Sequence, residues 1–367
     1  MTTNKDIKSL YVHIPFCHSL CAYCDFPKLL AIKSFIHPYL LSLKKELDSY
    51  YINKDLDTLY IGGGTPTSLD DEEFSFLLSM LDEYTSNIKE YTIEANPESL
   101  SKNKLEMMKI HGVNRLSIGV ESTNDDILKS INRLHTFDDV KKVMKEARNL
   151  GFDNISLDLI LGLPGVNDEM LKEDIKRIIK LKPNHISCYS LTIHDHTKMG
   201  IDRIEPPNDD EMRKKYDLVA SLLHEAGYQH YEISNWCKDD KMSLHNLTYW
   251  KDEKYFGVGL GASGYVNNYR YTNTLNISEY IKGKYIQTKD NIDQDDDFEY
   301  LMLSLRTILG VNYQEYQRRF HEGFLSKYLF KIKKNDDLKY FIFEKDHCYL
   351  NYEGMMILDT IFLNLIS

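Results

Sequence analysis

The feature that most constrains the fold is an alternation of short apolar runs with longer amphipathic stretches. Six runs rich in β-branched and aromatic residues recur, and each is followed by a helix-like segment. Near-continuous apolar strands separated by helices are typical of a parallel sheet covered on both faces. The pattern predicts an α/β fold, either a (β/α) barrel or partial barrel or a doubly wound sheet. The runs are LYVHIPF (10–16), TLYIGGG (58–64), YTIEAN (91–96), RLSIGV (115–120), NISLDLILGLP (154–164) and HISCYSLTI (185–193).

The pattern changes in the second half of the chain. YEISNW (231–236) is compatible with a seventh strand, and the acidic stretch 290–297 is the best domain boundary. The pattern of residues 298–367 predicts helices with a small hairpin, an arrangement that resembles a winged helix. These residues contain nine Lys and Arg and nine Asp and Glu, so their net charge is zero, which favours a structural or docking module over a DNA-binding one. We expect a core domain at 1–236, a connecting region at 237–297 and a winged-helix-like domain at 298–367.

Composition limits the classes of function. The 367 residues carry 45 Lys and Arg against 56 Asp and Glu, and the net charge of −11 argues against bulk binding to nucleic acid or anionic membranes. No run approaches the ~20 apolar residues of a membrane span. The first residues are polar and lack the apolar stretch of a signal peptide. We therefore expect a cytoplasmic protein with reduced thiols, no nucleic-acid partner and no integral membrane segment.

Three of the six cysteines lie on one short loop after the first predicted strand. Cys17, Cys21 and Cys24 have the spacing C-x3-C-x2-C. Three thiolates so placed can hold three irons of a [4Fe–4S] cluster, and the fourth iron is left open for another ligand. Zinc is an alternative, but structural zinc needs four ligands and the sequence offers no second paired set. A chance grouping of buried cysteines is the third interpretation.

The sequence around this loop, YVHIPFCHSLCAYCDF, resembles the signature of radical S-adenosylmethionine (SAM) enzymes. More narrowly, the chain is similar to the branch that contains oxygen-independent coproporphyrinogen III oxidase and the HemW-type heme chaperones. The resemblance implies a partial TIM-like barrel, a [4Fe–4S] cluster and SAM, which a reduced cluster cleaves to a 5′-deoxyadenosyl radical. It covers nearly the whole chain, through GGGTPT (62–67), EANPE (94–98), GVNRLSIGVES (112–122), LDLILGLPG (157–165), YEISN (231–235) and HNLTYW (245–250).

The resemblance places SAM at the carboxyl ends of the strands. Glycines there let the backbone approach a ligand closely, and a carboxylate at a strand end can accept hydrogen bonds from ribose hydroxyls. The structural alternatives are a tight turn closed by Pro66, a solvated or helix-capping carboxylate and a surface arginine. The predicted SAM-binding residues are Tyr11, Gly63, Gly64, Thr65, Glu94, Glu121, Arg133 and Asp158.

A second motif, HNLTYW, matches the HNxxYW sequence of the heme-chaperone branch. By this resemblance His245, Tyr249 and Trp250 bind heme, with the imidazole as axial ligand and the aromatic rings against the porphyrin. The structural alternative is a histidine that caps a turn beside core aromatics. The glycine-rich run at 257–264 lacks the strand–helix context of a dinucleotide loop, so we expect it to pack closely against the barrel or a ligand, with the structural role preferred.

Three departures separate the chain from the oxidase. Phe26 stands where the oxidase has a further cysteine, the arm before the first strand is short, and Glu121 replaces a glutamine that contacts a second SAM. They favour a heme chaperone that binds heme b and SAM and transfers heme to apo-hemoproteins. Oxidative decarboxylation of coproporphyrinogen III, a step of porphyrin biosynthesis, is the alternative. An electron donor and a homodimer are compatible with the resemblance, which identifies no catalytic residue.

Overall fold

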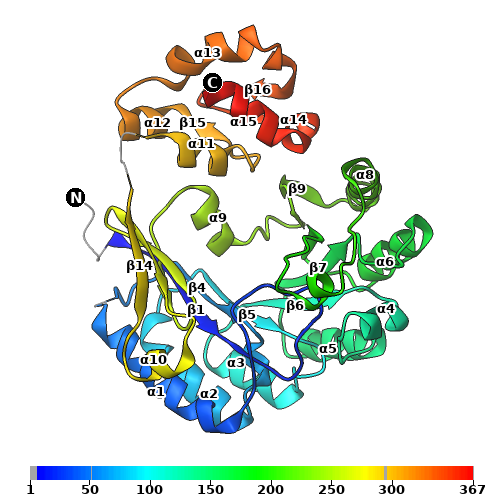
Figure 1. The fold of residues 1–367 in the computed structure, drawn as a ribbon, viewed down its shortest axis with the longest axis vertical. Coiled ribbons are helices and arrows are strands. Elements are labelled where there is room, and N and C mark those ends of the chain that lie inside the picture. Colours follow the sequence, from blue (N-terminus) through cyan, green and yellow to red (C-terminus); the bar gives the residue numbers. More distant parts are fainter. Residues whose placement is uncertain (1–5, 51, 293–295, 367) are drawn as a thin grey trace.

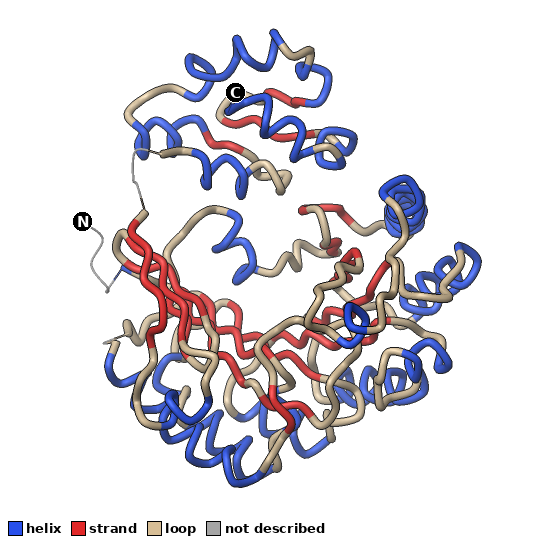
Figure 2. Tube along the Cα trace, viewed as in Figure 1, coloured by secondary structure: helices blue, strands red, loops and turns tan. Residues whose placement is uncertain are grey.

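A nine-stranded sheet with helices along its outer face forms most of the molecule (Figures 1 and 2). The computed structural model describes residues 6–50, 52–292 and 296–366. Six parallel strands stand side by side in chain order, which confirms the predicted α/β fold with a parallel sheet. They are β1 (Ser9–Ile14), β4 (Thr58–Gly63), β5 (Glu90–Ala95), β6 (Arg115–Glu121), β7 (Ile155–Leu161) and β8 (His185–Ser190).

Helices connect these strands and cover the convex side of the sheet (Figure 1). Most begin at a side chain that accepts a hydrogen bond from the first turn, such as Asp70, Ser101 and Thr136, which is why each helix starts where it does. The helices are α1 (Lys33–Ser49), α2 (Asp71–Ser79), α3 (Lys102–Ile110), α4 (Asp125–Ser130), α5 (Phe137–Asn149), α6 (Asp168–Lys180), α7 (Lys198–Ile201) and α8 (Asp209–Glu225).

The predicted seventh strand at 231–236 is wrong. These residues form a hairpin in which β9 (Gln229–Glu232) and β10 (Asn235–Cys237) are antiparallel, and β10 is antiparallel to β8. Two residues link β9 and β10, and only an antiparallel pair can be joined so tightly. The seventh strand of the parallel set is β11 (Phe256–Val258), which pairs with β1 at the opposite edge of the sheet.

The glycine-rich run after β11 packs closely, as expected. A Cβ atom on Gly257 would lie 1.8 Å from the carbonyl oxygen of Ser263. Gly259 has a φ of +107°, and its Cβ would lie 2.5 Å from the carbonyl oxygen of His13 in β1. The run leads into an antiparallel sheet beside the barrel. The elements of this region are α9 (Leu244–Trp250), β12 (Ser263–Val266), β13 (Tyr269–Asn273), α10 (Ile277–Ile281) and β14 (Ile286–Asn291).

The C-terminal elements enclose a second cluster of buried side chains, between Tyr300 and Leu365. The predicted hairpin is present as β16 and β17, and β15 pairs with β17. The limits of the three predicted domains remain a prediction, and residues 293–295 of the acidic stretch lie outside the described residues. The elements are α11 (Phe298–Ser304), β15 (Val311–Asn312), α12 (Tyr313–Phe320), α13 (Phe324–Lys334), β16 (Phe341–Phe343), β17 (His347–Leu350), α14 (Tyr352–Met356) and α15 (Leu358–Ile366).

Helix lengths and polarity bear on membrane insertion. Across the described ranges, none of the helices has both the length and the apolar character needed to cross a bilayer. The most apolar helix, α15, covers nine residues and buries Leu358, Ile361, Phe362 and Leu365 in the C-terminal cluster.

Candidate functional site

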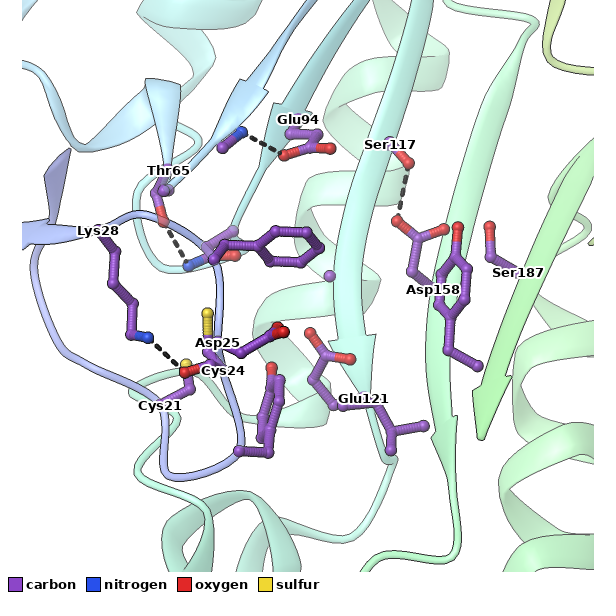
Figure 3. Close-up of a pocket in the computed structure, with 18 of the residues that line it drawn as sticks. Cys21, Cys24, Asp25, Lys28, Thr65, Glu94, Ser117, Glu121, Asp158 and Ser187 are labelled. Carbon is purple, nitrogen blue, oxygen red and sulfur yellow. Dashed lines mark hydrogen bonds between the residues drawn. The ribbon is translucent and has the colours of Figure 1, made fainter. Parts of the chain in front are cut away.

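A cavity of about 480 Å³ lies at the carboxyl ends of the parallel strands (Figure 3). Strand ends meet there because all six strands run in one direction, which is where α/β folds place their ligands. The structure brings most of the predicted site residues to this one cavity. Those that line it are Cys17, Cys21, Cys24, Gly63, Gly64, Thr65, Glu94, Glu121, Arg133 and Asp158.

The cysteine loop runs across one side of the cavity, as Figure 3 shows for Cys21 and Cys24. Two short strands, β2 (Phe16–Cys17) and β3 (Leu29–Leu30), pair in parallel and close the loop at its base. The backbone N–H of Ala22 donates to the carbonyl oxygen of Ile131 at 3.0 Å, which ties the middle of the loop to the segment after α4. The three thiols are therefore held by backbone pairing at both ends and the centre.

Polar groups face two of these sulfur atoms. The hydroxyl of Thr65 donates to Sγ of Cys17, and Nη1 of Arg133 donates to Sγ of Cys21, each at 3.7 Å. Burial raises the pKa of the Cys17 thiol to about 11, so binding a metal there releases a proton. Within the described ranges, no group of three or more His, Cys, Asp or Glu side chains is placed so that it could hold a metal ion in this conformation. Three thiols on one loop, two of which accept a hydrogen bond, still offer one ligand to each of three irons of a cluster.

The turn after β4 brings the backbone to the cavity wall. Gly63 has a φ of +114°, and a Cβ on Gly64 would lie 2.7 Å from the carbonyl carbon of Pro15. Thr65 then donates its N–H to the carbonyl oxygen of Phe16, and Pro66 begins a single 3₁₀ turn. The glycines therefore permit both the tight turn and the cavity wall, so the two interpretations of this motif are compatible.

Glu94 is the last residue but one of β5, and its carboxylate lies in the cavity (Figure 3). One oxygen accepts from the hydroxyl of Tyr60 at 2.8 Å, and the other accepts from the N–H of Gly63 at 2.9 Å. Burial raises the pKa of this carboxyl group. Each carboxylate oxygen can accept more than one hydrogen bond, so acceptor capacity remains for a hydroxyl-bearing ligand.

Glu121 ends β6 in a strained backbone conformation. Its φ is 64°, in the left-handed region, and the pairing of β6 with β7 shifts register there. Its carboxylate lies 3.6 Å from Nη1 of Arg133, and Nη2 of that guanidinium donates to Oδ1 of Asn96 at 3.0 Å. Left-handed non-glycine residues cluster at functional sites because the surrounding structure must hold them there. Arg133 thus joins the cysteine loop to the ends of β5 and β6.

Sequence reasoning missed the serine hydroxyl groups around Asp158, of which those of Ser117 and Ser187 belong to lining residues of the cavity. Asp158 accepts from Ser117 at 2.7 Å, as Figure 3 shows, and from Ser156 at 2.8 Å. The Ser156 hydroxyl also lies 2.8 Å from Nδ1 of His185. Strand register places Ser117 beside Glu94, and Ser187 beside Asp158. Small polar residues inside otherwise apolar strands are the signal that could have found them, since alternate residues share a face.

Tyr11 is the predicted SAM residue that lies away from the cavity. It is absent from the described cavity lining, and its hydroxyl group lies 2.9 Å from Nδ1 of His13. Its ring packs 6.1 Å from the ring of Tyr60 and 6.5 Å from that of His245. Tyr11 is the third residue of β1 and precedes the carboxyl end of that strand, Ile14, by three positions.

His245 is buried inside the molecule instead of facing the cavity. Its Nδ1 lies 2.8 Å from the Thr58 hydroxyl, and its Nε2 lies 2.8 Å from the Tyr249 hydroxyl. The side chain is 0% exposed, and burial lowers the pKa of the imidazole to about 3. Both ring nitrogens are engaged, so this conformation speaks against His245 as an iron ligand. Its neighbour Asn246 lines the cavity.

The two aromatic residues of the motif also make structural contacts. Tyr249 packs edge-on against Tyr255 with ring centroids 4.6 Å apart. The guanidinium of Arg306, two residues after α11, lies 4.6 Å from the ring centroid of Trp250 at the end of α9. Helix α9 therefore joins the barrel to the C-terminal elements, and heme contact by Tyr249 and Trp250 stays a prediction.

Comparison with known proteins agrees with this geometry. The model of the radical SAM superfamily matches residues 11–178. The chain is 35% identical to the heme chaperone HemW of Bacillus subtilis over 97% of this chain and 98% of that protein. It is 34% identical to HemW of Escherichia coli over 82% of each chain. The solved structure of coproporphyrinogen III oxidase (HemN) from Escherichia coli has a TM-score of 0.86 at 22% identity, over 99% of this chain and 91% of that one, which shows a shared fold.

Proposed function

Because this chain belongs to the family of the heme chaperone HemW, within the radical SAM superfamily, we propose that it binds heme and transfers it to apo-hemoproteins. The observation that carries the proposal is the single cavity lined by three cysteines and by all but one of the predicted SAM residues. Phe26 in place of a further cysteine also favours the chaperone over the oxidase.

We propose that Cys17, Cys21 and Cys24 hold a [4Fe–4S] cluster, and that SAM binds between this loop and the strand ends. When bound, the cluster supplies an electron and one open iron position for SAM. The residues of the chain hold these groups in place: Thr65 and Arg133 donate hydrogen bonds to sulfur, and Glu94 presents a carboxylate. Burial in the cavity limits the access of water.

The proposal includes the setting in which the protein acts. Reduced thiols on the cluster loop suit the cytoplasm, where disulfides are rare. A redox protein would supply the electron for the cluster, and an apo-hemoprotein would accept the heme. We also propose that the protein forms a homodimer. Sedimentation of the cluster-loaded protein measures its mass in solution and tests this.

The test is anaerobic reconstitution with iron and sulfide, followed by titration with ferric heme and by transfer to a heme-depleted acceptor hemoprotein. We expect cluster absorption, a Soret band and transfer to the acceptor faster than from free heme. Cys24→Ala should lose the cluster, whereas Cys188→Ala should keep it, because Cys188 is buried in β8 away from the loop. Absence of heme uptake by cluster-loaded protein would sink the proposal.

The same preparation tests the oxidase alternative. Incubation with reductant, SAM and coproporphyrinogen III should give no protoporphyrinogen. Glu121 stands where the oxidase has the neutral amide that contacts a second SAM, and a carboxyl group whose pKa is raised by burial offers that ligand different hydrogen bonds. Formation of protoporphyrinogen would make the alternative the better account of the site.

A further inference from the structure

Two exposed histidines follow β8 at the rim of the cavity. His194 lines the cavity with its side chain 44% exposed, and it is the one histidine among the described lining residues. His196 lies two residues further along the same loop, with the two ring centroids 5.8 Å apart, and is not among those lining residues. Both histidines are exposed and lie on the same loop, but only His194 lines the cavity. His194 is therefore the candidate ligand, and His196 is its matched control.

A carboxylate lies beside the first of these imidazoles. Nε2 of His194 lies 3.1 Å from Oδ2 of Asp25, the residue directly after Cys24. This is an ion-pair distance, and among the described residues neither ring nitrogen of His194 takes part in a hydrogen bond. The neutral imidazole can therefore offer a ring nitrogen to a metal ion. Metal-binding histidines usually donate their other N–H to a carboxylate or carbonyl, which fixes the ring and raises its basicity, and Asp25 is the carboxylate within reach for that role.

Aromatic surface is exposed beside the same imidazole. Phe26 is 64% exposed and Tyr189 is 44% exposed, and both line the cavity with His194. Two exposed aromatic side chains that line one cavity offer apolar surface to a ligand there. Flat macrocycles pack well on aromatic rings. The rim thus offers an exposed imidazole together with apolar contacts, the chemistry that heme binding requires.

We propose that His194 is an axial ligand of heme iron at this rim, with Asp25 as its positioning residue. The inference rests on the proposed heme-binding function and deepens it. It supplies an exposed imidazole whose ring nitrogens make no hydrogen bond in the described structure, whereas both ring nitrogens of His245 are engaged inside the barrel. The cargo would then lie at the mouth of the cavity, beside the cysteine loop.

The experiment titrates ferric heme into the full-length, cluster-loaded protein and into the variants His194→Ala, His196→Ala and Asp25→Asn. Iron and sulfide content should be equal in all four. We expect His194→Ala to lose the imidazole-ligated Soret and electron paramagnetic resonance signals and to bind heme at least about tenfold more weakly. His196→Ala should bind within about twofold of the unchanged protein. Asp25→Asn should weaken binding about tenfold and lower the ferrous iron–histidine stretching frequency, which a merely structural role would not move.

The outcomes separate this inference from the proposed function. If the unchanged protein takes up no heme, the proposed function fails. If it takes up heme and His194→Ala keeps the imidazole signals, the function stands and the inference is overturned. Equal losses in His194→Ala and His196→Ala also overturn it. If only a folded His245→Ala variant loses the imidazole-ligated heme signals, the ligand lies on α9 and the inference is overturned as well.

Discussion

Glu46 illustrates how far the environment of one residue can depart from its sequence context. It stands in the polar segment KKELDS of α1, yet it is 0% exposed. Its carboxylate accepts from the N–H of Gly259 at 2.9 Å and the amide of Asn273 at 2.6 Å, and also from the Tyr280 hydroxyl. These donors come from chain positions more than 200 residues away. Burial raises the pKa of Glu46 to about 7.

This pKa predicts a pH-dependent stability. Between the unfolded value near 4.5 and the folded value near 7, the folded state holds a proton that the unfolded chain has released. The free energy of unfolding should therefore fall as pH rises through this window. Glu46→Gln removes this contribution, so the stability difference between unchanged protein and variant should move by about 2–3 kcal/mol in favour of the variant from pH 5 to pH 8. Urea unfolding at each pH measures it.

The exposed Glu72→Gln variant provides the control, since its profile should run parallel to that of the unchanged protein. Parallel profiles for Glu46→Gln as well would show that the carboxyl group is ionised at all these pH values. Sequence alone could not reveal that Glu46 is buried, because an acidic residue in a polar segment is predicted to lie on the solvent-exposed face of its helix.

At the level of elements, β11 shows what a short strand needs in order to join a sheet. Its three residues pair with β1, and the chain then turns at Gly259 against His13 and the hydroxyl of Tyr39. The local sequence predicted close packing of the glycine run. It could not show which strand would be the neighbour, because paired residues such as Leu10 and Phe256 are 246 positions apart along the chain.

Alanine at Gly259 should therefore be costly. Gly259 and Gly112 both have positive φ, at +107° and +83°, but a Cβ on Gly112 would meet no heavy atom within 4 Å. Backbone strain affects both variants at about 1–3 kcal/mol, and the clash with the carbonyl oxygen of His13 affects only the first. Gly259→Ala should lose about 1–3 kcal/mol more than Gly112→Ala, measured by chemical unfolding. Equal losses would mean that β1 and the glycine run can move apart without cost.

Across the whole molecule, Asp252 joins three parts of the chain just after α9. It accepts from Arg270 of β13 at 3.0 Å and from Arg319 of α12 at 3.1 Å. Arg319 also donates to the backbone carbonyl groups of Lys251 and Asp252, each at 3.2 Å. Burial raises the pKa of Asp252 to about 6 in spite of the two guanidinium groups. This ionic contact connects the C-terminal helices to the barrel.

Removing Arg319 should loosen the C-terminal helices. Arg319→Gln should cost about 1–2 kcal/mol, since carbonyl and carboxylate acceptors lose a charged donor. Arg318→Gln is the control, because that side chain is 70% exposed and bonds only to Glu315 in the described structure; it should stay within about 0.5 kcal/mol. Hydrogen exchange of α12 reports the local effect. Similar exchange in both variants would argue against the contact as a connection between the two parts.

The sequence by itself determined the parallel strands, the cysteine loop and most of the cavity lining, because strand patterns and loop spacing are local. Tertiary structure decided where side chains at the strand ends and on α9 point. His245 turns inward to Thr58 of β4, while Asn246 faces the cavity. The hairpin of β9 and β10, the burial of Glu46 and the pairing of His194 with Asp25 were decided in the same way. Each depends on groups distant in the chain or on the direction a strand takes, and no local periodicity encodes which partners packing brings together.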